Sequence, residues 1–347
     1  MRVLQVDSGR AWRGGQNQVW LLCRELSREP GGGIEQALVT KEGAELAQRA
    51  ATGGIRVLGT AWDIGLDPRA WWHLGRTIAA FQPDVIHVHD SHALTLVATV
   101  ALGRKIVATR RVEFHTGRFG AWRRPDRIIA ISEAVKHVLI GDGIAGDAIV
   151  VVHDGIDVAE VRQAAAAPPP LDVRRQFGIP ASAPLAVNAA ALTGEKDHRT
   201  LIRAAHYARA KRPNLHWLIA GDGKLRESLV AEIRRLGLGD RVHLLGHVDR
   251  VDALIAGAGV FVLSSKSEGL GSVVLNALAL GRPVVATAAG GIPEILPPDA
   301  LVPVDDAEAL AQKVVGVLDH PTPVPFPEGF SAHAMAQGVL DVYRALL

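Results

Sequence analysis

Residues 260–272 read Val260-Phe261-Val262-Leu263-Ser264-Ser265-Lys266-Ser267-Glu268-Gly269-Leu270-Gly271-Ser272. The apolar run, the glycine turn and the apolar positions that follow predict a buried strand, a tight turn and the start of a helix. Units of this kind build parallel sheets that helices cover on both faces. The segment therefore predicts an α/β fold with polar residues at the carboxyl end of a strand.

The same alternation of strand and helix patterns extends along the whole chain. We interpret as strands the apolar runs at 3–6, 37–40, 56–58, 85–88, 105–109, 127–131, 149–152, 185–189, 215–220, 242–245, 260–263 and 284–286. Residues 163–170 read Gln-Ala-Ala-Ala-Ala-Pro-Pro-Pro and predict an exposed linker. We expect two Rossmann-like, doubly wound lobes at 1–163 and 171–325 that face each other across a cleft, and a helix over 331–347 that packs back across the linker onto the first lobe.

Composition excludes several classes of protein. With 48% hydrophobic and 21% charged residues, the 347-residue chain is neither disordered nor fibrous. A net charge of +2 provides no global field for nucleic acid. The single Cys23 lies in an apolar helical pattern, which predicts a buried, inert thiol. Because neither a secretory leader nor a run of transmembrane length is apparent, we expect a cytoplasmic protein.

The turn after residue 263 has the chemistry of a phosphate site. Gly269 and Gly271 let the backbone approach a ligand, and the first free amides of the next helix suit a diphosphate. Since a carboxylate repels phosphate, we predict that Glu268 accepts hydrogen bonds from sugar hydroxyls and that Ser272 caps the helix or contacts phosphate. The alternative is a glycine-rich connection with a solvated Glu268.

Two further turns carry similar signals. Lys196 follows the strand at 185–189 and could neutralise a departing diphosphate, or it could be a surface lysine beside a helix cap at Asp197 or Thr193. Gly14-Gly15 after the first strand forms a candidate phosphate nest. Its spacing is not that of the dinucleotide fingerprint, which disfavours a nicotinamide dehydrogenase.

The run His87-Val88-His89-Asp90-Ser91-His92 raises the possibility of a metal site. Histidines two apart on a strand share a face, and two-metal hydrolases use a similar string. The aspartate and the final histidine are out of step with that string, and no second cluster completes a coordination sphere. We therefore predict no metal, a core histidine at His87, and cleft polarity at His89 and Asp90.

Taken together, these turns resemble family 4 of the retaining glycosyltransferases, the two-lobed type called GT-B. The matching segments are Gly14-Gly15, Asp84-Val85-Ile86-His87-Val88-His89, Ile129-Ala130-Ile131-Ser132-Glu133, Val152-His153-Asp154-Gly155-Ile156-Asp157, Glu195-Lys196-Asp197-His198, Ala220-Gly221-Asp222-Gly223, Ser267-Glu268-Gly269-Leu270-Gly271 and Gly290-Gly291-Ile292-Pro293-Glu294.

The resemblance implies a role for each matching residue. Glu268 would hold hydroxyls of the donor sugar, and Lys196 would bind the outer phosphate. Gly15 would approach that phosphate from the other lobe, and the segment around Val248 would meet the nucleobase. The amides that would meet the diphosphate are those of Leu270, Gly271 and Ser272, after Gly269. The resemblance implies a nucleotide sugar as substrate, no metal or other cofactor, and no dedicated protein base.

The sequence departs from the family at three places. Asn276 stands where a second glutamate of the family binds the ribose hydroxyls, so this position can still bond a diol but lacks the charge. Ala191 replaces an arginine five positions before Lys196. Arg110-Arg111 replaces a histidine, which puts a contact of that histidine to the sugar in doubt.

We expect transfer to a glycan or lipid-linked acceptor in cell-envelope or glycoconjugate biosynthesis. The alternatives are a sugar-nucleotide epimerase or hydrolase on the same scaffold, a non-catalytic two-lobed binding protein and a metal-dependent hydrolase.

We assign acceptor or sugar binding to Arg111 and His89. Residues 104–127 hold eight basic residues against two acidic ones, with Phe114, Phe119 and Trp122 interleaved. Such a segment could contact anionic lipid at the inner face of a membrane, or it could be a solvated loop. Trp62, Trp71 and Trp72 could stack on sugar rings, although a tryptophan pair on a helix is more typical of core packing.

Overall fold

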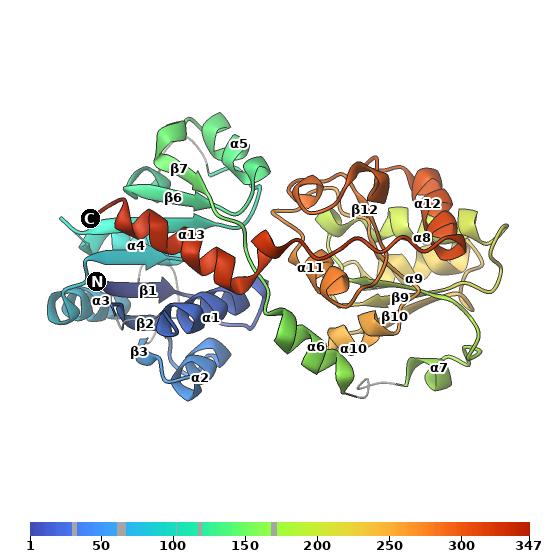
Figure 1. Ribbon diagram of the computed structural model, residues 1–347, viewed down its shortest axis with the longest axis horizontal. Helices are drawn as coiled ribbons and strands as arrows, with labels where there is room; N and C mark the ends of the chain where they lie inside the picture. Colours follow the sequence, from blue (N-terminus) through green and yellow to red (C-terminus); the bar gives the residue numbers. More distant parts are fainter. Residues whose placement is uncertain (30–32, 61–66, 102, 117–119, 168–171) are drawn as a thin grey trace. The chain divides into compact units, whose positions relative to one another are not determined.

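The computed structural model describes residues 1–29, 33–60, 67–101, 103–116, 120–167 and 172–347. The chain forms two compact units (Figure 1). The first consists of Met1–Gly155 together with Glu328–Leu347, and the second consists of Ile156–Pro327.

The first unit is built on a seven-stranded parallel sheet with the order β3-β2-β1-β4-β5-β6-β7. Its strands are β1 (Arg2–Asp7), β2 (Glu35–Lys41), β3 (Arg56–Thr60), β4 (Val85–Val88), β5 (Lys105–Arg110), β6 (Arg127–Ala130) and β7 (Ile149–Val151). The central strands are buried on both faces, as the unbroken apolar runs predict. The strand order reverses between β1 and β4, which are adjacent with Val3 opposite Val85.

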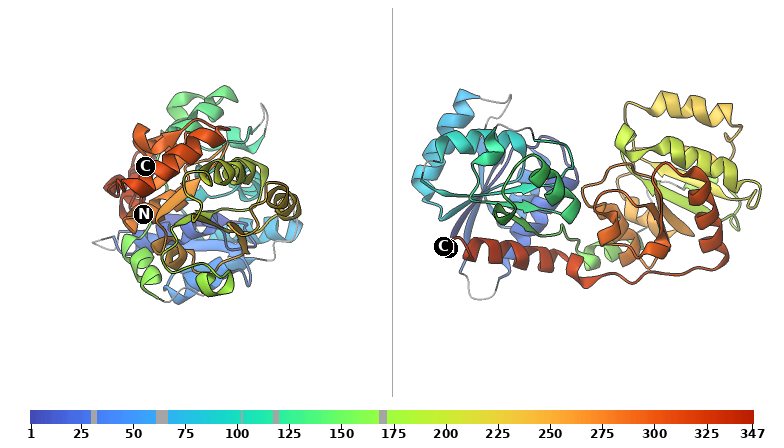
Figure 2. Two further views of the ribbon diagram at one scale, coloured as in Figure 1. Left: turned by 90° about the vertical axis from the view of Figure 1, so that its right-hand side faces the viewer. Right: turned by 90° about the horizontal axis from the view of Figure 1, so that it is seen from above.

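Helices lie on both faces of this sheet (Figure 2). They are α1 (Gly14–Ser27), α2 (Glu45–Thr52), α3 (Pro68–Phe81), α4 (Ser91–Val100), α5 (Glu133–Gly141) and α13 (Ala332–Arg344), with short 3₁₀ turns at Ala121–Arg123, Gly146–Ala148 and Glu328–Phe330. Helix α13 packs on α1 and buries Met335, Val339 and Tyr343 in the core of the first unit. The predicted return of the C-terminal helix to the first lobe is confirmed.

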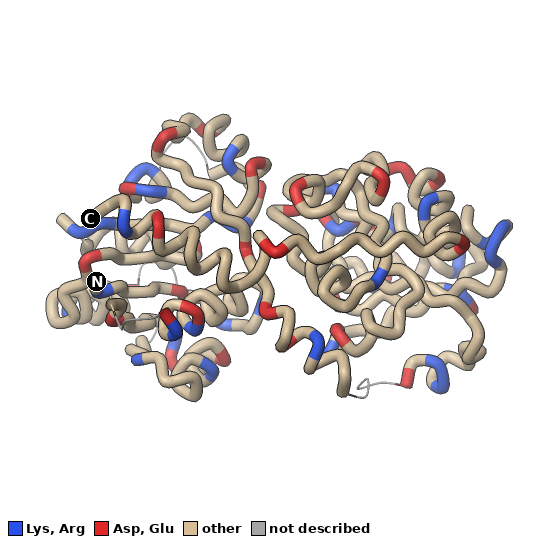
Figure 3. Tube along the Cα trace, in the orientation of Figure 1, with Lys and Arg blue, Asp and Glu red and all other residues tan. Residues whose placement is uncertain are grey.

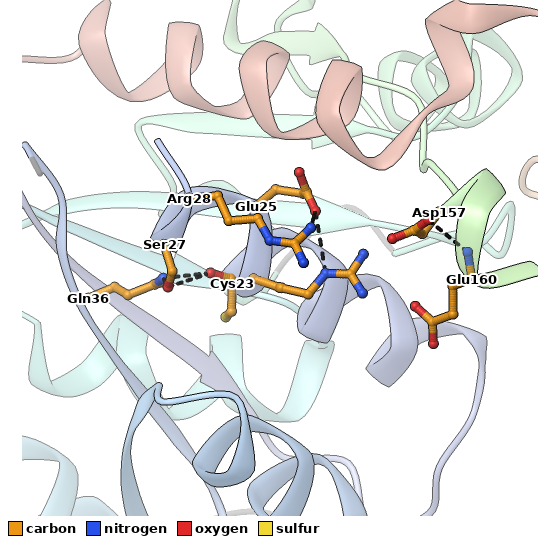
Figure 4. Close-up of polar contacts among 8 residues, drawn as sticks. Cys23, Glu25, Ser27, Arg28, Gln36, Asp157 and Glu160 are labelled. Atoms are coloured by element: carbon orange, nitrogen blue, oxygen red, sulfur yellow. Dashed lines mark hydrogen bonds and ion pairs between the residues drawn. The ribbon is translucent and has the colours of Figure 1, made fainter. Parts of the chain in front are cut away.

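Helix α1 carries the single cysteine. The backbone carbonyl of Cys23 accepts hydrogen bonds from Ser27 Oγ at 3.1 Å and Gln36 Nε2 at 2.6 Å (Figure 4). Its thiol is fully buried, and this burial raises the thiol pKa to about 12. Cys23 is therefore the inert core thiol that the sequence predicts.

The second unit is built on a six-stranded parallel sheet with the order β10-β9-β8-β11-β12-β13. Its strands are β8 (Leu185–Ala189), β9 (His216–Ala220), β10 (Val242–Gly246), β11 (Val260–Leu263), β12 (Val284–Thr287) and β13 (Leu301–Val302). Its helices are α6 (Val158–Ala166), α7 (Val173–Gln176), α8 (His198–Ala208), α9 (Arg226–Arg235), α10 (Val251–Ala256), α11 (Ser272–Ala279) and α12 (Ala307–Asp319), with 3₁₀ turns at Gly194–Lys196, Ile292–Glu294 and Pro298–Ala300. Both units are therefore doubly wound parallel α/β folds, as predicted.

The predicted linker begins too early. Residues 163–166 belong to α6, which Asp157 caps by accepting a hydrogen bond from the Glu160 amide (Figure 4). Arg162 of the same helix donates to the carbonyl of Ala279 at 3.0 Å, inside the second unit. Alanine is the strongest helix former, so the alanine run extends the helix up to the prolines. The chain passes between units at residues 155 and 156, and Pro168 to Pro170 lie outside the described residues.

The tryptophan pair on α3 is exposed, contrary to the core interpretation. Trp71 and Trp72 are 47% and 57% exposed, because the buried stripe of α3 consists of Ala70, Leu74, Ile78 and Phe81. Trp71 Nε1 donates to Thr99 Oγ1 at 3.2 Å, and the Arg76 guanidinium lies 4.6 Å from the Trp72 ring centre. Trp62 lies outside the described residues.

Positively and negatively charged residues are interspersed along the chain trace of each unit (Figure 3). Of the helices in the described part of the chain, none has both the length and the apolar character needed to cross a membrane.

Candidate active site

The candidate site lies where the strand order of the second unit reverses. Strands β8 and β11 are neighbours, and the order of the strands reverses between them. A crevice at the carboxyl ends of two such strands is where open α/β sheets bind ligands. The 3₁₀ turn Gly194–Lys196 follows β8, and the loop 264–271 follows β11.

The two loops bring Lys196 and Glu268 into contact. Lys196 Nζ donates to Glu268 Oε1 at 2.6 Å, and Ser265 Oγ donates to the same oxygen at 3.3 Å. The Lys196 side chain is 22% exposed and that of Glu268 is 11% exposed, so the pair is partly buried but reachable. The two residues predicted to bind phosphate and sugar therefore share one place in the structure.

Hydrogen bonds to main-chain carbonyls hold the two loops against each other. The Lys266 amide donates to the Glu195 carbonyl at 2.8 Å, and Ser264 Oγ donates to the Lys196 carbonyl at 3.0 Å. The Gly291 amide donates to the Glu268 carbonyl at 3.0 Å, which gives the Gly290-Gly291-Ile292-Pro293-Glu294 motif a supporting role. Lys196 and Glu268 are thus positioned by main-chain contacts.

His198, the histidine of the Glu195-Lys196-Asp197-His198 motif, belongs to a hydrogen-bond network that supports the site. His198 Nε2 lies 3.1 Å from Asn188 Oδ1, and Asn188 Nδ2 donates to the Val262 carbonyl at 2.9 Å, which ties β8 to β11. Burial lowers the pKa of His198 to about 4, so the ring is neutral at physiological pH. Asp197 caps α8 through the Thr200 amide, which confirms the predicted capping role.

Two glycines of the turn after β9 support the Lys196 loop from the other side. Gly221 has φ +140, and a Cβ there would lie 1.9 Å from the Ala190 carbonyl oxygen. A Cβ at Gly223 would lie 2.6 Å from the Leu192 carbonyl oxygen. These positions accept only glycine because the loop leading to Lys196 passes directly against them.

Helix α11 begins without a side-chain cap. Its N-cap residue is Gly271, at φ +85, and no described side chain caps it. Ser272 is the first helical residue, so the predicted capping role of Ser272 is wrong, and its contact with phosphate stays a prediction. The first turn of α11 contains no acidic residue, which leaves its amides suited to an anion.

Asn276 lies one turn further along α11 and has a partner that the sequence did not predict. Asn276 Nδ2 donates to Asp252 Oδ1 of α10 at 2.7 Å. Asp252 belongs to no motif that the sequence analysis singled out. In the loop before α10, Val248 is half-buried, whereas His247 is exposed and lies 3.1 Å from Asp249.

In the first unit, Gly14 and Gly15 open α1, whose N-cap Arg13 makes no side-chain capping bond. Apart from the adjacent residues and the backbone of α1 itself, no described atom lies within 4 Å of a Cβ built on either glycine, so packing does not demand glycine there. The neighbouring Asp7 at the end of β1 is buried, and burial with the nearby Asp90 carboxylate raises its pKa to about 6.

His87 and His89 belong to a buried network of the first unit. His87 Nδ1 lies 2.6 Å from the Tyr343 hydroxyl and His87 Nε2 lies 2.7 Å from Thr109 Oγ1, which confirms a core histidine. His89 Nε2 lies 2.8 Å from Gln5 Oε1. Burial lowers the pKa of both rings well below the usual range, so both are neutral.

We predicted that His89 is a polar residue of a cleft. The His89 ring is instead only 6% exposed, because it packs beside His87. Asp90 instead caps α4 through the amides of His92 and Ala93. Among the described residues, no group of three or more His, Cys, Asp or Glu could hold a metal ion.

Several basic residues of the segment 104–127 form hydrogen bonds or ion pairs within the first unit. Arg111 Nε lies 3.2 Å from Asp154 Oδ1, and Arg111 also donates to the His89 carbonyl at 3.5 Å. Arg110 donates to Ser91 Oγ and to the Phe114 carbonyl. Arg123 donates to the carbonyls of Asp142 and Gly143, and Lys105 pairs with Asp126. Arg118 and Phe119 lie outside the described residues.

Both units match models of known protein families. Residues 12–160 match the family model "Glycosyltransferase Family 4", and residues 171–334 match the model "Glycosyl transferases group 1". A lipopolysaccharide core biosynthesis glycosyltransferase of Rhizobium meliloti is 33% identical over 145 residues, which is 41% of this chain and 41% of that protein. The 2-deoxystreptamine N-acetyl-D-glucosaminyltransferase of Streptomyces fradiae is 26% identical, over 86% of this chain and 81% of that protein.

A solved structure shares the whole fold. The crystal structure of Anabaena HepE in complex with UDP and glucose superposes with a TM-score of 0.83 at 18% identity, covering 99% of this chain and 100% of that one.

Proposed function

The chain belongs to the family 4, group 1 glycosyltransferases of the GT-B fold, and from this premise we propose that it transfers a sugar, with retention of configuration, from a nucleoside-diphosphate sugar. The acceptor is a glycan or lipid-linked molecule of cell-envelope or glycoconjugate biosynthesis. The observation that carries the proposal is the contact between Lys196 and Glu268. Glu268 lies in the loop that leads to the uncapped start of α11.

In this proposal, different residues of the second unit contact different parts of the donor. The amides of Leu270, Gly271 and Ser272, reached past Gly269, receive the diphosphate. An ammonium group has three donors, so Lys196 can keep its bond to Glu268 and still bind the outer phosphate. Glu268 retains acceptor capacity for sugar hydroxyls. Val248 contacts the base and Asn276 lies toward the ribose, and the resemblance assigns Gly15 of the first unit to the outer phosphate.

The reaction breaks the bond between the anomeric carbon and the diphosphate oxygen, and it forms a bond from that carbon to an acceptor oxygen. The departing phosphate takes the proton of the acceptor hydroxyl. Lys196 and the amides of α11 stabilise the negative charge that develops on the leaving group, which is where electrostatic stabilisation has its largest effect. Neither a metal ion nor another cofactor enters this scheme.

The acceptor binds to the first unit. Arg111, held by Asp154, supplies a positive charge near the ends of β4 and β5, and its bond to the His89 carbonyl places His89 beside it. The Rhizobium meliloti relative acts in lipopolysaccharide core biosynthesis, which supports a lipid-linked or glycan acceptor. We place the enzyme in the cytoplasm, with peripheral contact to anionic lipid at the inner membrane face.

A thermal-shift panel tests the donor site. The protein is heated with each of the common nucleoside diphosphates, starting with UDP because the HepE complex contains it, with and without a chelator, and separately with zinc. We expect one base to raise the melting temperature by several degrees, unaffected by the chelator. A response to zinc alone, or to no nucleotide, would contradict the proposal.

An activity assay separates transfer from the alternative reactions. The sugar nucleotide of the preferred base is incubated with the enzyme in the presence and absence of an acceptor extract. Turnover that requires the acceptor supports transfer. Equal turnover without any acceptor would instead favour an epimerase or a hydrolase on the same scaffold.

A further inference from the structure

The contact between Asp252 and Asn276 lies next to the proposed donor site. Asn276 is the fifth residue of α11 and is four residues after Ser272, so both side chains lie on the same face of the helix, one turn apart. Helices α6, α10 and α11 pack on one another in the second unit (Figure 1). Asp252, in the first turn of α10, is thereby brought to the Asn276 side chain at 2.7 Å.

Among the residues that the structure describes, none supplies a cation to Asp252. Within the described part of the chain, the one hydrogen bond to its carboxylate comes from Asn276, and no lysine or arginine pairs with it. Burial raises the pKa of Asp252, the bond from Asn276 lowers it, and the nearby Glu160 raises it. A half-buried carboxylate without a cation is costly, and such groups are enriched at sites that bind ligands.

The carboxylate has unused capacity toward a ligand. Oδ1 accepts the Asn276 bond, while Oδ2 has no hydrogen-bond partner among the described residues. A carboxylate can accept bonds from two neighbouring hydroxyls, and a charged acceptor forms stronger bonds than an amide. In a nucleoside diphosphate, the group adjacent to the diphosphate is the ribose, with its two neighbouring hydroxyls. A diphosphate at the start of α11 would place that ribose about one helical turn along, about 5 Å away.

Resting on the proposed function, we propose that Asp252 binds the ribose diol of the donor nucleotide and that Asn276 positions it. The carboxylate that the resemblance expects at position 276 is then supplied by α10, across the helix contact. Asn276 donates one hydrogen to Asp252 and retains its carbonyl oxygen and second hydrogen for the same ribose. The structural alternative is that this bond only joins α10 to α11.

The test compares ribose with deoxyribose. Affinities of UDP, GDP, ADP and CDP and of their 2′-deoxy counterparts are measured by calorimetry at pH 8, on wild type, Asp252→Asn and the control Asp249→Asn. Asp249 is an exposed carboxylate three residues before Asp252, in the loop that precedes α10. For the preferred base we expect wild type and Asp249→Asn to bind the ribose form at least tenfold more tightly than the deoxyribose form.

In Asp252→Asn we expect that preference to fall to threefold or less, because the ribose form loses affinity while the deoxyribose form stays within twofold of wild type. A fall in both affinities by the same factor, or an unchanged preference, would overturn the inference and leave donor binding standing. If wild type binds none of the nucleotides, the proposed function fails and the inference with it. Unfolding in urea checks that Asp252→Asn remains folded.

Discussion

Lys196 Nζ lies 2.6 Å from Glu268 Oε1, and the two residues are 72 positions apart in the chain. One follows β8 and the other follows β11, and the sheet makes these two strands neighbours. The pair places the cation of the turn after β8 beside the acceptor in the loop before the uncapped helix α11. The two charges balance each other, so a cation and an acceptor are held side by side in a fixed geometry.

Lys196→Ala and Glu268→Ala should each lower the rate of transfer by about 100-fold or more, because each removes a group proposed to contact the donor. Their melting temperatures should stay within about 3 °C of wild type, since backbone contacts hold both loops. Lys136→Ala and Glu133→Ala are matched controls, because these residues form a Lys–Glu pair at 3.9 Å on α5. Unchanged transfer in Lys196→Ala or Glu268→Ala would remove that residue from the site.

Gly15→Ala should weaken donor binding without destabilising the protein. A Cβ at Gly15 meets open space, and alanine is a better helix former than glycine. The same methyl group would stand between the α1 backbone and the phosphate. We expect unchanged or higher stability in urea together with a raised KM for the donor. An unaltered KM would show that Gly15 does not approach the donor.

Gly221→Ala should behave in the opposite way. Gly221 has φ +140, and the new Cβ would lie 1.9 Å from the Ala190 carbonyl oxygen. The backbone must therefore move, at a cost of about 2 kcal/mol or more. The displaced segment leads into the turn that carries Lys196, so transfer should fall together with stability. Unfolding in urea and the transfer assay measure both effects. Wild-type stability in this variant would contradict the packing described for this turn.

Tyr343→Phe should destabilise the first unit by about 1–3 kcal/mol, because it leaves the buried His87 Nδ1 without its partner at 2.6 Å. Gln5 Nε2, which donates to the same hydroxyl at 3.3 Å, would also lose an acceptor. Tyr207→Phe provides the control, since Tyr207 is 51% exposed on α8. Equal stability of both variants in urea would show that the network contributes nothing to folding.

Asp7→Asn should stabilise the protein more at pH 8 than at pH 5. The pKa of Asp7 is raised to about 6 in the folded state from an ordinary 3.8, so the folded protein binds the proton more tightly than the unfolded chain. Stability therefore falls as pH rises through this window, and the loss is complete above about pH 7. Asparagine does not ionise and escapes this loss. A stability difference that is the same at both pH values would contradict the raised pKa.

The sequence predicted those strands, turns and helix caps that depend on residues close together in the chain. The apolar run at Val260–Leu263 and the glycine turn after it are strand and turn in the structure, and Asp197 caps α8 as its position indicates. Strand patterns and caps depend on neighbours within a few residues, which is why they can be read from the chain. The same reasoning identified Cys23 as a buried thiol.

Contacts between distant segments were decided only by the tertiary structure. No local pattern tells that Asp252 meets Asn276, that Trp71 and Trp72 lie off the buried stripe of α3, or that α6 belongs to the second unit. These facts depend on which helix faces pack together. The sequence by itself determined the two α/β lobes and the chemical character of the Lys196 and Glu268 turns. The strand order, which places β8 against β11, decided that these turns form one site, because it brings loops 72 residues apart to the same edge of a sheet.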